Sequence, residues 1–193
     1  MKNSKKPDNN HRIRYTRKIL KESLIDLMKE CSITKIGIKD ICALAKVSRS
    51  TFYSHYEGVW DLLADIEEEM FSYFEDTSVQ WGVTVKCGDL NFVTMFEKQL
   101  QYIADSGNVL KILLSENGSS SFQEKFFKMF MEHSQKVLQN ESIVPDDVHI
   151  YEGYAAFYVT GSIGLLQYWL KNNMHIPIPK LARMYENLIV KKI

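Results

Sequence analysis

The chain has 193 residues, 45% of them apolar, with only 9 glycines and 4 prolines. This composition supports a hydrophobic core and disfavours an all-β fold with many turns. The net charge is zero but unevenly spread: residues 1–56 hold 13 lysines and arginines against 5 acidic residues, whereas residues 57–193 hold 11 against 19. A basic first part beside an acidic remainder is typical of a protein that binds nucleic acid at one end.

The N-terminal region combines a basic arm with a helix. Residues 1–10 are lysine-rich, and no regular structure is expected for them. Apolar residues recur at helical spacing over residues 12–31, which predicts the first helix, and basic side chains such as Arg17 and Lys21 lie on its other face. Residues 32–37 break this pattern.

Two short helices follow, separated by a tight turn. Ile38, Ile41, Cys42 and Ala45 recur at i, i+3, i+4 and i+7, which predicts a helix over residues 38–45. A turn at residues 46–47 leads to Ser48, whose hydroxyl is expected to accept a backbone N–H at the start of a third helix. This arrangement indicates a helix-turn-helix, whose second helix enters the DNA major groove.

The third helix has two faces. Val47, Phe52 and Tyr56 are expected to hold it onto the first two helices, and the outward face is formed by Arg49, Ser50, Tyr53 and Ser54. Spacing alone leaves an alternative open, in which Tyr53 belongs to the core and Arg49 is only a solvated charge.

The rest of the chain also has helical patterns, and we expect helices over residues 59–77, 89–106, 109–115, 121–140, 147–172 and 179–192. Glu67-Glu68-Glu69 is interpreted as a solvated face rather than a metal site. The uncharged stretch Gly153–Leu170 is interpreted as a buried helix rather than a membrane span, because it is short and holds several polar groups. The fold class is therefore all-α.

The run IKDICALAKVSRSTFYSHY at residues 38–56 resembles the TetR-type (tetracycline-repressor-like) DNA-binding domain. The resemblance covers residues 12–74, with the helix-turn-helix at residues 37–56. It implies a larger helical domain over residues 75–193 for ligand binding and dimerisation. The order V-S-[KR]-x-T-[FL]-Y-x-H-[FY] is specific, whereas residues beyond 74 are similar to the family only in length and helical make-up.

The resemblance implies DNA contacts, with the tyrosine and the histidine mostly on phosphate. Arg49 has a guanidinium that can bind guanine or phosphate, and Lys39, at the start of the second helix, can hold a phosphate. The expected DNA-binding residues are Lys39, Ser48, Arg49, Ser50, Thr51, Tyr53, Ser54 and His55. Two departures remove expected phosphate contacts: Gly37 stands where many members have threonine, and Val59 where many have lysine.

The resemblance implies a transcriptional regulator, and we expect a repressor that binds a pseudo-palindromic operator. It is expected to bind as a homodimer that forms through the last two helices. A small apolar or aromatic effector is expected to release it from the operator. The residues expected to line an effector pocket are Trp81, Phe92, Phe96, Tyr102, Phe126, Phe130, Tyr154, Phe157 and Tyr158. An aromatic at helical spacing also fits plain core. The alternative is a TetR-like regulator controlled by a protein partner, and activation also stays open.

The sequence gives little support for an enzyme. HExxH, GxSxG and a phosphate-binding glycine loop are absent, and the five histidines show no metal-ligand spacing. We expect no cofactor and no metal. Cys31, Cys42 and Cys87 are interpreted as free thiols rather than as zinc ligands or disulfides, in a cytoplasmic protein without a membrane segment.

Overall fold

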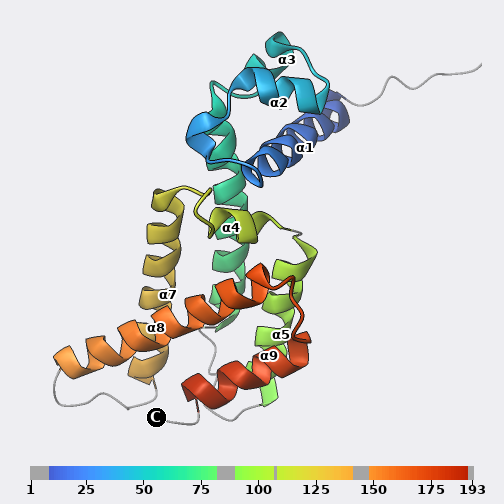
Figure 1. The fold of residues 1–193 in the computed structure, drawn as a ribbon. Helices are drawn as coiled ribbons and strands as arrows, with labels where there is room; N and C mark the ends of the chain where they lie inside the picture. Colours follow the sequence, from blue (N-terminus) through green and yellow to red (C-terminus); the bar gives the residue numbers. More distant parts are fainter. Residues whose placement is uncertain (1–8, 82–89, 107, 141–147, 191–193) are drawn as a thin grey trace, which may run out of the picture.

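The computed structural model describes residues 9–81, 90–106, 108–140 and 148–190, and within these ranges all regular structure is helical. Figure 1 shows a small N-terminal head, a long helix that leads out of it, and a larger helical body. The predicted all-α class is confirmed.

The head consists of α1 (Asn9–Met28), the 3₁₀ turn η1 (Ile33–Lys35), α2 (Ile38–Ala45) and α3 (Arg49–Tyr53). The first turns of α4 (Val59–Trp81) complete it. The head forms around a set of apolar side chains that are at most 1% exposed: Leu20, Leu24, Met28, Ile41, Phe52, Leu62 and Leu63. Because burying one such side chain stabilises the fold by about 1.5–3 kcal/mol, this cluster fixes the helix-turn-helix on α1 and α4.

Helix α4 joins the head to the body. Its first turns lie within the head, and it continues without a break past residue 75, the predicted domain boundary (Figure 1). That boundary stays a prediction, and one continuous helix crosses it.

The body is formed by α5 (Leu90–Asp105), α6 (Val109–Leu113), α7 (Ser120–Asn140), α8 (Val148–Lys171), α9 (Ile178–Tyr185) and a final π-helical turn, η2 (Glu186–Val190). Phe74 of α4 packs edge-on against Phe126 of α7, with ring centroids 5.6 Å apart. Trp169, 1% exposed, donates from Nε1 to the carbonyl of Ile176 at 2.8 Å. The hydroxyl of Tyr185 donates to the carbonyl of Ser162 at 2.6 Å, which holds α9 against α8.

The predicted helices are confirmed, with shifted ends. Helix α1 begins at Asn9 and ends at Met28 rather than spanning residues 12–31, and α4 continues to Trp81 rather than ending at residue 77. The predicted last helix, residues 179–192, is α9 followed by η2, as far as residue 190. Such end shifts are ordinary, because the last turns depend on capping and packing more than on periodicity.

The interpretation of Glu67 as part of a solvated face is wrong. Its side chain is buried, with 8% of the residue exposed, and it accepts a 2.6 Å hydrogen bond from the hydroxyl of Ser119. Ser119 lies just before α7, 52 residues from Glu67 in the sequence. A charge run on a helix cannot reveal a partner that distant.

Cys42 is buried and Cys31 is half-buried, and both are free thiols, whereas Cys87 lies outside the described residues. Burial raises the pKa of the Cys42 thiol, which keeps it protonated at neutral pH. Among the helices that the structure describes, none has the length and apolarity needed to cross a membrane.

Candidate DNA-binding surface

The turn between α2 and α3 is set by Lys46, which caps α2 in the left-handed region with φ of 55°. A left-handed residue ends a helix abruptly and redirects the chain. The N–H of Val47 then bonds to the carbonyl of Cys42 at 3.1 Å. The predicted tight turn is therefore formed by backbone geometry.

Ser48 caps α3 as the sequence predicted. Its Oγ accepts the backbone N–H of Thr51 at 3.1 Å and lies 2.8 Å from the hydroxyl of Ser50. The three hydroxyls of Ser48, Ser50 and Thr51 thus form a polar cluster at the helix N-terminus, where backbone N–H groups favour phosphate.

The third helix divides into the two predicted faces. Phe52 is fully buried and Tyr56 is 4% exposed, and these two rings hold α3 on the head. Arg49, Ser50 and Ser54 are exposed, and Tyr53 is 58% exposed with only the edge of its ring against Phe52. The alternative in which Tyr53 belongs to the core is therefore wrong.

The remaining predicted contacts are less open. Thr51 and His55 are half-buried, and Lys39 is exposed on the first turn of α2. The hydroxyl of Ser54 donates to the carbonyl of Thr51 at 2.7 Å, so its proton is already used inside the helix. Arg49, Ser50 and Tyr53 are exposed groups on this face.

The N-terminus of α2 is capped by its own acid. At Gly37, where no side chain can cap, the backbone N–H donates to Oδ2 of Asp40 at 3.1 Å. This carboxylate places a negative charge at the start of α2, which disfavours phosphate there. Gly37 itself offers no hydroxyl at this helix start.

A similar cap is found at α4. The N–H of Glu57 donates to Oδ2 of Asp61 at 2.8 Å, while Val59 is half-buried and Trp60 is 57% exposed. Val59 offers no cation at this helix start. The expected loss of phosphate contacts at Gly37 and Val59 stays a prediction.

A network of polar side chains joins α1 and α4 beneath the recognition helix. The guanidinium of Arg17 lies 2.7 Å from Oδ1 of Asp65, and its Nε donates to the hydroxyl of Tyr56 at 3.1 Å. Lys21 lies 2.6 Å from both Asp65 and Glu69. Arg17 and Asp65 therefore fix the phenol of Tyr56, three residues after Tyr53, against both long helices of the head, and Lys21 and Glu69 extend the network.

Burial alone raises the pKa of Asp65, but hydrogen bonds from Arg17, Lys21 and Tyr56 outweigh it and lower the pKa to about 2. Burial, followed by the hydrogen bond to Asp65, raises the pKa of Tyr56. Asp65 is therefore a carboxylate at neutral pH and Tyr56 a neutral phenol that donates to it.

The sequence pattern places Arg17 and Lys21 on the face of the first helix opposite its apolar stripe, and it does not reveal this network. A signal was present in the spacing. Arg17 and Lys21 are four residues apart, as are Asp65 and Glu69, so one helix carries two cations and another two anions on matching faces. What the pattern lacks is any indication that these two helices are neighbours.

The predicted effector-pocket residues lie in separate groups. Phe126 is fully buried against Phe130, with centroids 4.8 Å apart, between α4 and α7. Phe96 packs on Tyr185 at 4.6 Å, and Tyr102 stacks on Tyr73.

The other members of the set lie elsewhere. On α8, Tyr154 and Phe157 are 54% and 72% exposed, and Tyr158 is half-buried. The side chains of Trp81 and Phe92 lie outside the described part of the structure. The set stays a prediction, and the described members do not converge on one space.

With the head and its recognition helix described, comparison with known proteins decides the family. A model of the TetR type, described as "Transcriptional regulator C-terminal region", matches residues 91–191, slightly more than half of the chain. The chain belongs to the TetR family of transcriptional regulators. This TetR assignment rests on the body, whereas the resemblance noted above rests on the head, so the two lines of evidence are independent.

One curated relative of this TetR-family chain is the uncharacterized HTH-type transcriptional regulator YxbF of Bacillus subtilis (strain 168). It is 24% identical over 185 residues, which cover 90% of this chain. The aligned part is 44% of YxbF, so the chain spans less than half the length of that relative.

Solved structures show the same fold. A TetR transcriptional regulator from Streptococcus agalactiae 2603V superposes with a TM-score of 0.63 at 22% identity, over 94% of this chain and 97% of the other. The regulator FadR from Bacillus subtilis, solved in complex with stearoyl-CoA, gives a TM-score of 0.59 at 15% identity, over 91% and 98%. At these identities the likeness concerns the TetR fold and not the ligand.

Proposed function

We propose that this TetR-family protein binds a pseudo-palindromic operator as a homodimer and represses transcription until a small effector releases it. The observation that carries the proposal is the face of α3: Arg49, Ser50 and Tyr53 are exposed together, while Phe52 and Tyr56 fix the helix from behind. A rigidly held helix with an exposed arginine and hydroxyls has the chemistry that reads and grips a major groove.

Operator binding is tested by fluorescence anisotropy on a labelled fragment from upstream of its own gene. We expect Arg49→Ala to weaken binding about 5- to 150-fold, which corresponds to about 1–3 kcal/mol. Lys125→Ala, which removes an exposed cation from α7, away from α3 and from the last two helices, is the control and leaves the affinity unchanged. Unchanged operator affinity in Arg49→Ala contradicts the proposed role of α3.

Salt dependence separates the two roles of Arg49. If its guanidinium lies on a phosphate, the slope of log Kd against log salt falls by about one in Arg49→Ala. If it lies on guanine, discrimination between operator variants is lost at that base pair. Tyr53→Phe removes a hydroxyl without a charge, so it weakens binding and leaves the slope unchanged.

The homodimer is supported by the outer face of α8. Ile150, Tyr154, Phe157 and Tyr168 are 51–72% exposed and recur at helical spacing, which produces one apolar stripe. Gly161 and Gly164 lie on the same stripe, and nothing lies within 4 Å of a Cβ built on either. An apolar stripe with small residues at its centre suits close packing against a second copy of the helix.

Sedimentation equilibrium at micromolar concentration tests this interface. We expect a dimer for the wild type and a monomer for Phe157→Asp, because a carboxylate in an apolar interface has no partner. Tyr15→Asp changes an equally accessible aromatic on α1 and should leave the dimer intact. A monomeric wild type contradicts this part of the proposal.

Control by a protein partner is the second candidate. It is favoured by the aromatic packing between α4 and α7, where Phe71 lies 4.9 Å from Phe122 and Phe74 lies 5.6 Å from Phe126 (ring centroids), because these rings fill space that a small ligand would need. Absent or salt-insensitive operator binding by the purified protein favours this candidate over the first.

A further inference from the structure

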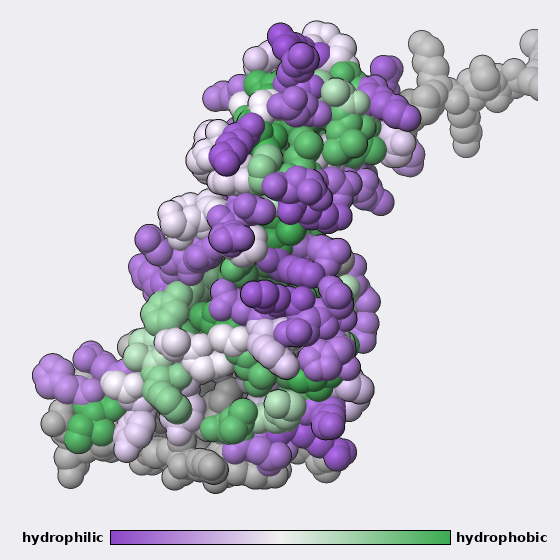
Figure 2. Space-filling model, in the orientation of Figure 1, coloured by the Kyte–Doolittle hydropathy of each residue, from purple (hydrophilic) through white to green (hydrophobic). Residues whose placement is uncertain are grey.

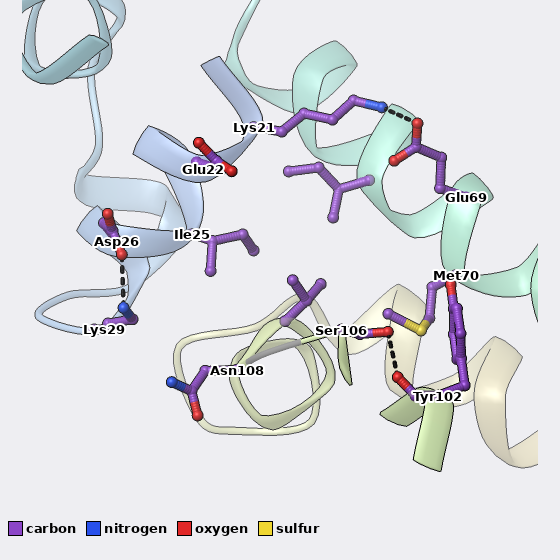
Figure 3. Close-up of a pocket in the computed structure, with 12 residues that line it drawn as sticks. Lys21, Glu22, Ile25, Asp26, Lys29, Glu69, Met70, Tyr102, Ser106 and Asn108 are labelled. Atoms are coloured by element: carbon purple, nitrogen blue, oxygen red, sulfur yellow. Dashed lines mark hydrogen bonds and ion pairs between the residues drawn. The ribbon is translucent and has the colours of Figure 1, made fainter. Parts of the chain in front are cut away.

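A cleft of about 530 Å³ lies where the head meets the body. Its walls come from α1 on the head side and from α4, α5 and the start of α6 on the body side (Figure 3). Hydrophilic side chains cover much of the visible surface where head and body meet, with apolar side chains between them (Figure 2). The size falls within the range of small-molecule sites.

The inner wall of the cleft is apolar. Ile25 of α1 and Ile66 and Met70 of α4 are 4–7% exposed, so a ligand that enters meets side chains already excluded from water. Tyr102 adds an aromatic ring whose other face is covered by Tyr73. An apolar or aromatic group is the moiety that this wall favours, since methionine and aromatic side chains adapt to such groups.

The charged groups of the cleft select the other end of the ligand. Its lining holds two lysines and three acids. Both lysines are occupied: Lys21 lies 2.6 Å from Glu69, and Lys29 lies 2.6 Å from Asp26, as the dashed lines in Figure 3 show. Lys21 lies 2.6 Å from Asp65 as well, whereas the exposed pair of Lys29 is weak. The lining holds more carboxylates than cations, so an anionic ligand is disfavoured.

The acids keep unused acceptors. The closest cation to Glu22 is Lys18, at 3.8 Å and on an exposed surface, so this pair is weak. Glu69 uses only Oε1 for Lys21, and its side chain is 67% exposed. Glu22 on α1 and Glu69 on α4 thus border the apolar wall, and each has a carboxylate oxygen that can accept a further hydrogen bond.

We propose that this cleft binds a small organic cation with an apolar or aromatic body, its ammonium group lying between Glu22 and Glu69 and its body on Ile25, Ile66 and Met70. This ligand would be the effector of the function proposed above, and its role in regulation rests on that function. The occupant contacts the head through α1 and the body through α4 to α6. Any movement of the head on operator binding therefore changes its affinity, and linkage requires the reciprocal effect.

Three probes with one carbon skeleton test the ligand class by isothermal titration calorimetry on the DNA-free protein. Tryptamine carries an ammonium, tryptophol a hydroxyl and indole-3-propionate a carboxylate on an indole side chain. We expect tryptamine to bind at least tenfold more tightly than tryptophol, and indole-3-propionate to bind most weakly. Equal affinities, or a preference for the carboxylate, overturn the proposal.

A matched pair of double variants tests the location. Glu22→Gln with Glu69→Gln removes the two cleft carboxylates, and we expect the Kd of tryptamine to rise at least fivefold. Glu30→Gln with Glu68→Gln removes two exposed acids close by in sequence but outside the cleft lining, and should change the Kd by less than twofold. An unchanged Kd in the cleft variant overturns the proposal.

Glu22→Gln alone serves if the double variant unfolds, because Glu22 has only its long pair to Lys18. We expect a two- to threefold rise in Kd, and no rise overturns the location. The two proposals fail separately: a protein that binds its operator but not tryptamine loses only this one, and a protein that binds tryptamine but no operator loses only the function proposed above.

Discussion

The hydroxyl of Tyr56 donates a hydrogen bond of 2.6 Å to Oδ2 of Asp65, and this bond ties the segment after the recognition helix to α4. Arg17 supports the same phenol from α1 at 3.1 Å, with its guanidinium 5.5 Å from the ring centroid. The orientation of α3 therefore depends on polar groups as well as on the buried ring of Phe52.

Tyr56→Phe keeps the buried ring and removes the hydroxyl. Arg17 and Asp65 then each lose a hydrogen bond, and we expect the free energy of unfolding to fall by about 1–2 kcal/mol. Urea denaturation followed by circular dichroism measures this loss. Tyr15→Phe removes a hydroxyl from a residue that is 59% exposed and should stay within about 0.5 kcal/mol of the wild type. Equal stabilities of the two variants contradict the role of the bond.

The stability of the head is expected to depend on Asp65 at acidic pH. Its folded-state pKa of about 2 lies below the ordinary value for aspartate. A lowered folded-state pKa contributes stability that is present above the unfolded-state pKa, near pH 4, and is lost as the pH falls through the folded-state value. Asp65→Asn should therefore be less stable than the wild type at pH 7, with the difference shrinking towards pH 2.

Thermal unfolding between pH 7 and pH 2 measures that convergence. Asp26→Asn is the control, because Asp26 forms an exposed pair with Lys29 and its removal should have a small effect at every pH. A constant difference between wild type and Asp65→Asn across this range argues against the titration of Asp65 as its source.

Ser48 combines a structural and a proposed DNA-binding role, and two substitutions separate them. Ser48→Ala removes the cap on Thr51 and should cost about 1 kcal/mol of stability, whereas Ser72→Ala on the exposed side of α4 should cost little. Ser48→Asp keeps a capping oxygen and should preserve stability, but it places a negative charge beside phosphate. Operator affinity measured with Ser48→Asp is expected to fall sharply although the protein stays folded.

Gly118 lies against the backbone at the end of α6. A Cβ added there falls 2.1 Å from the carbonyl oxygen of Leu113, so the loop must shift to accept any side chain. We expect Gly118→Ala to lower the free energy of unfolding by about 2 kcal/mol or more. Gly153→Ala meets nothing within 4 Å on an exposed helix position and should be neutral or stabilising. Chemical denaturation of both variants decides whether the close approach matters.

The helices, the recognition motif and the family resemblance can be predicted from local sequence patterns. Apolar side chains at helical spacing identify a helix and its buried face whatever surrounds it. The sequence therefore predicts α2 with its observed bounds, and it predicts that Phe52 is the buried residue that holds α3 on the head. Capping is equally local. The bond from the N–H of Thr51 to Ser48 spans three residues and follows from residue type alone.

Which helices face each other does not follow from periodicity and depends on how the chain packs. Glu67 was placed on a solvated face, yet Ser119 covers it from 52 residues away. Arg17 was placed on an outward face, yet its guanidinium pairs with Asp65. The cleft between α1 and α4 to α6 has the same origin, since its walls are distant in sequence. Periodicity fixes a side chain's direction on its own helix, whereas burial and charge pairing depend on the neighbouring helix, which only the packed fold supplies.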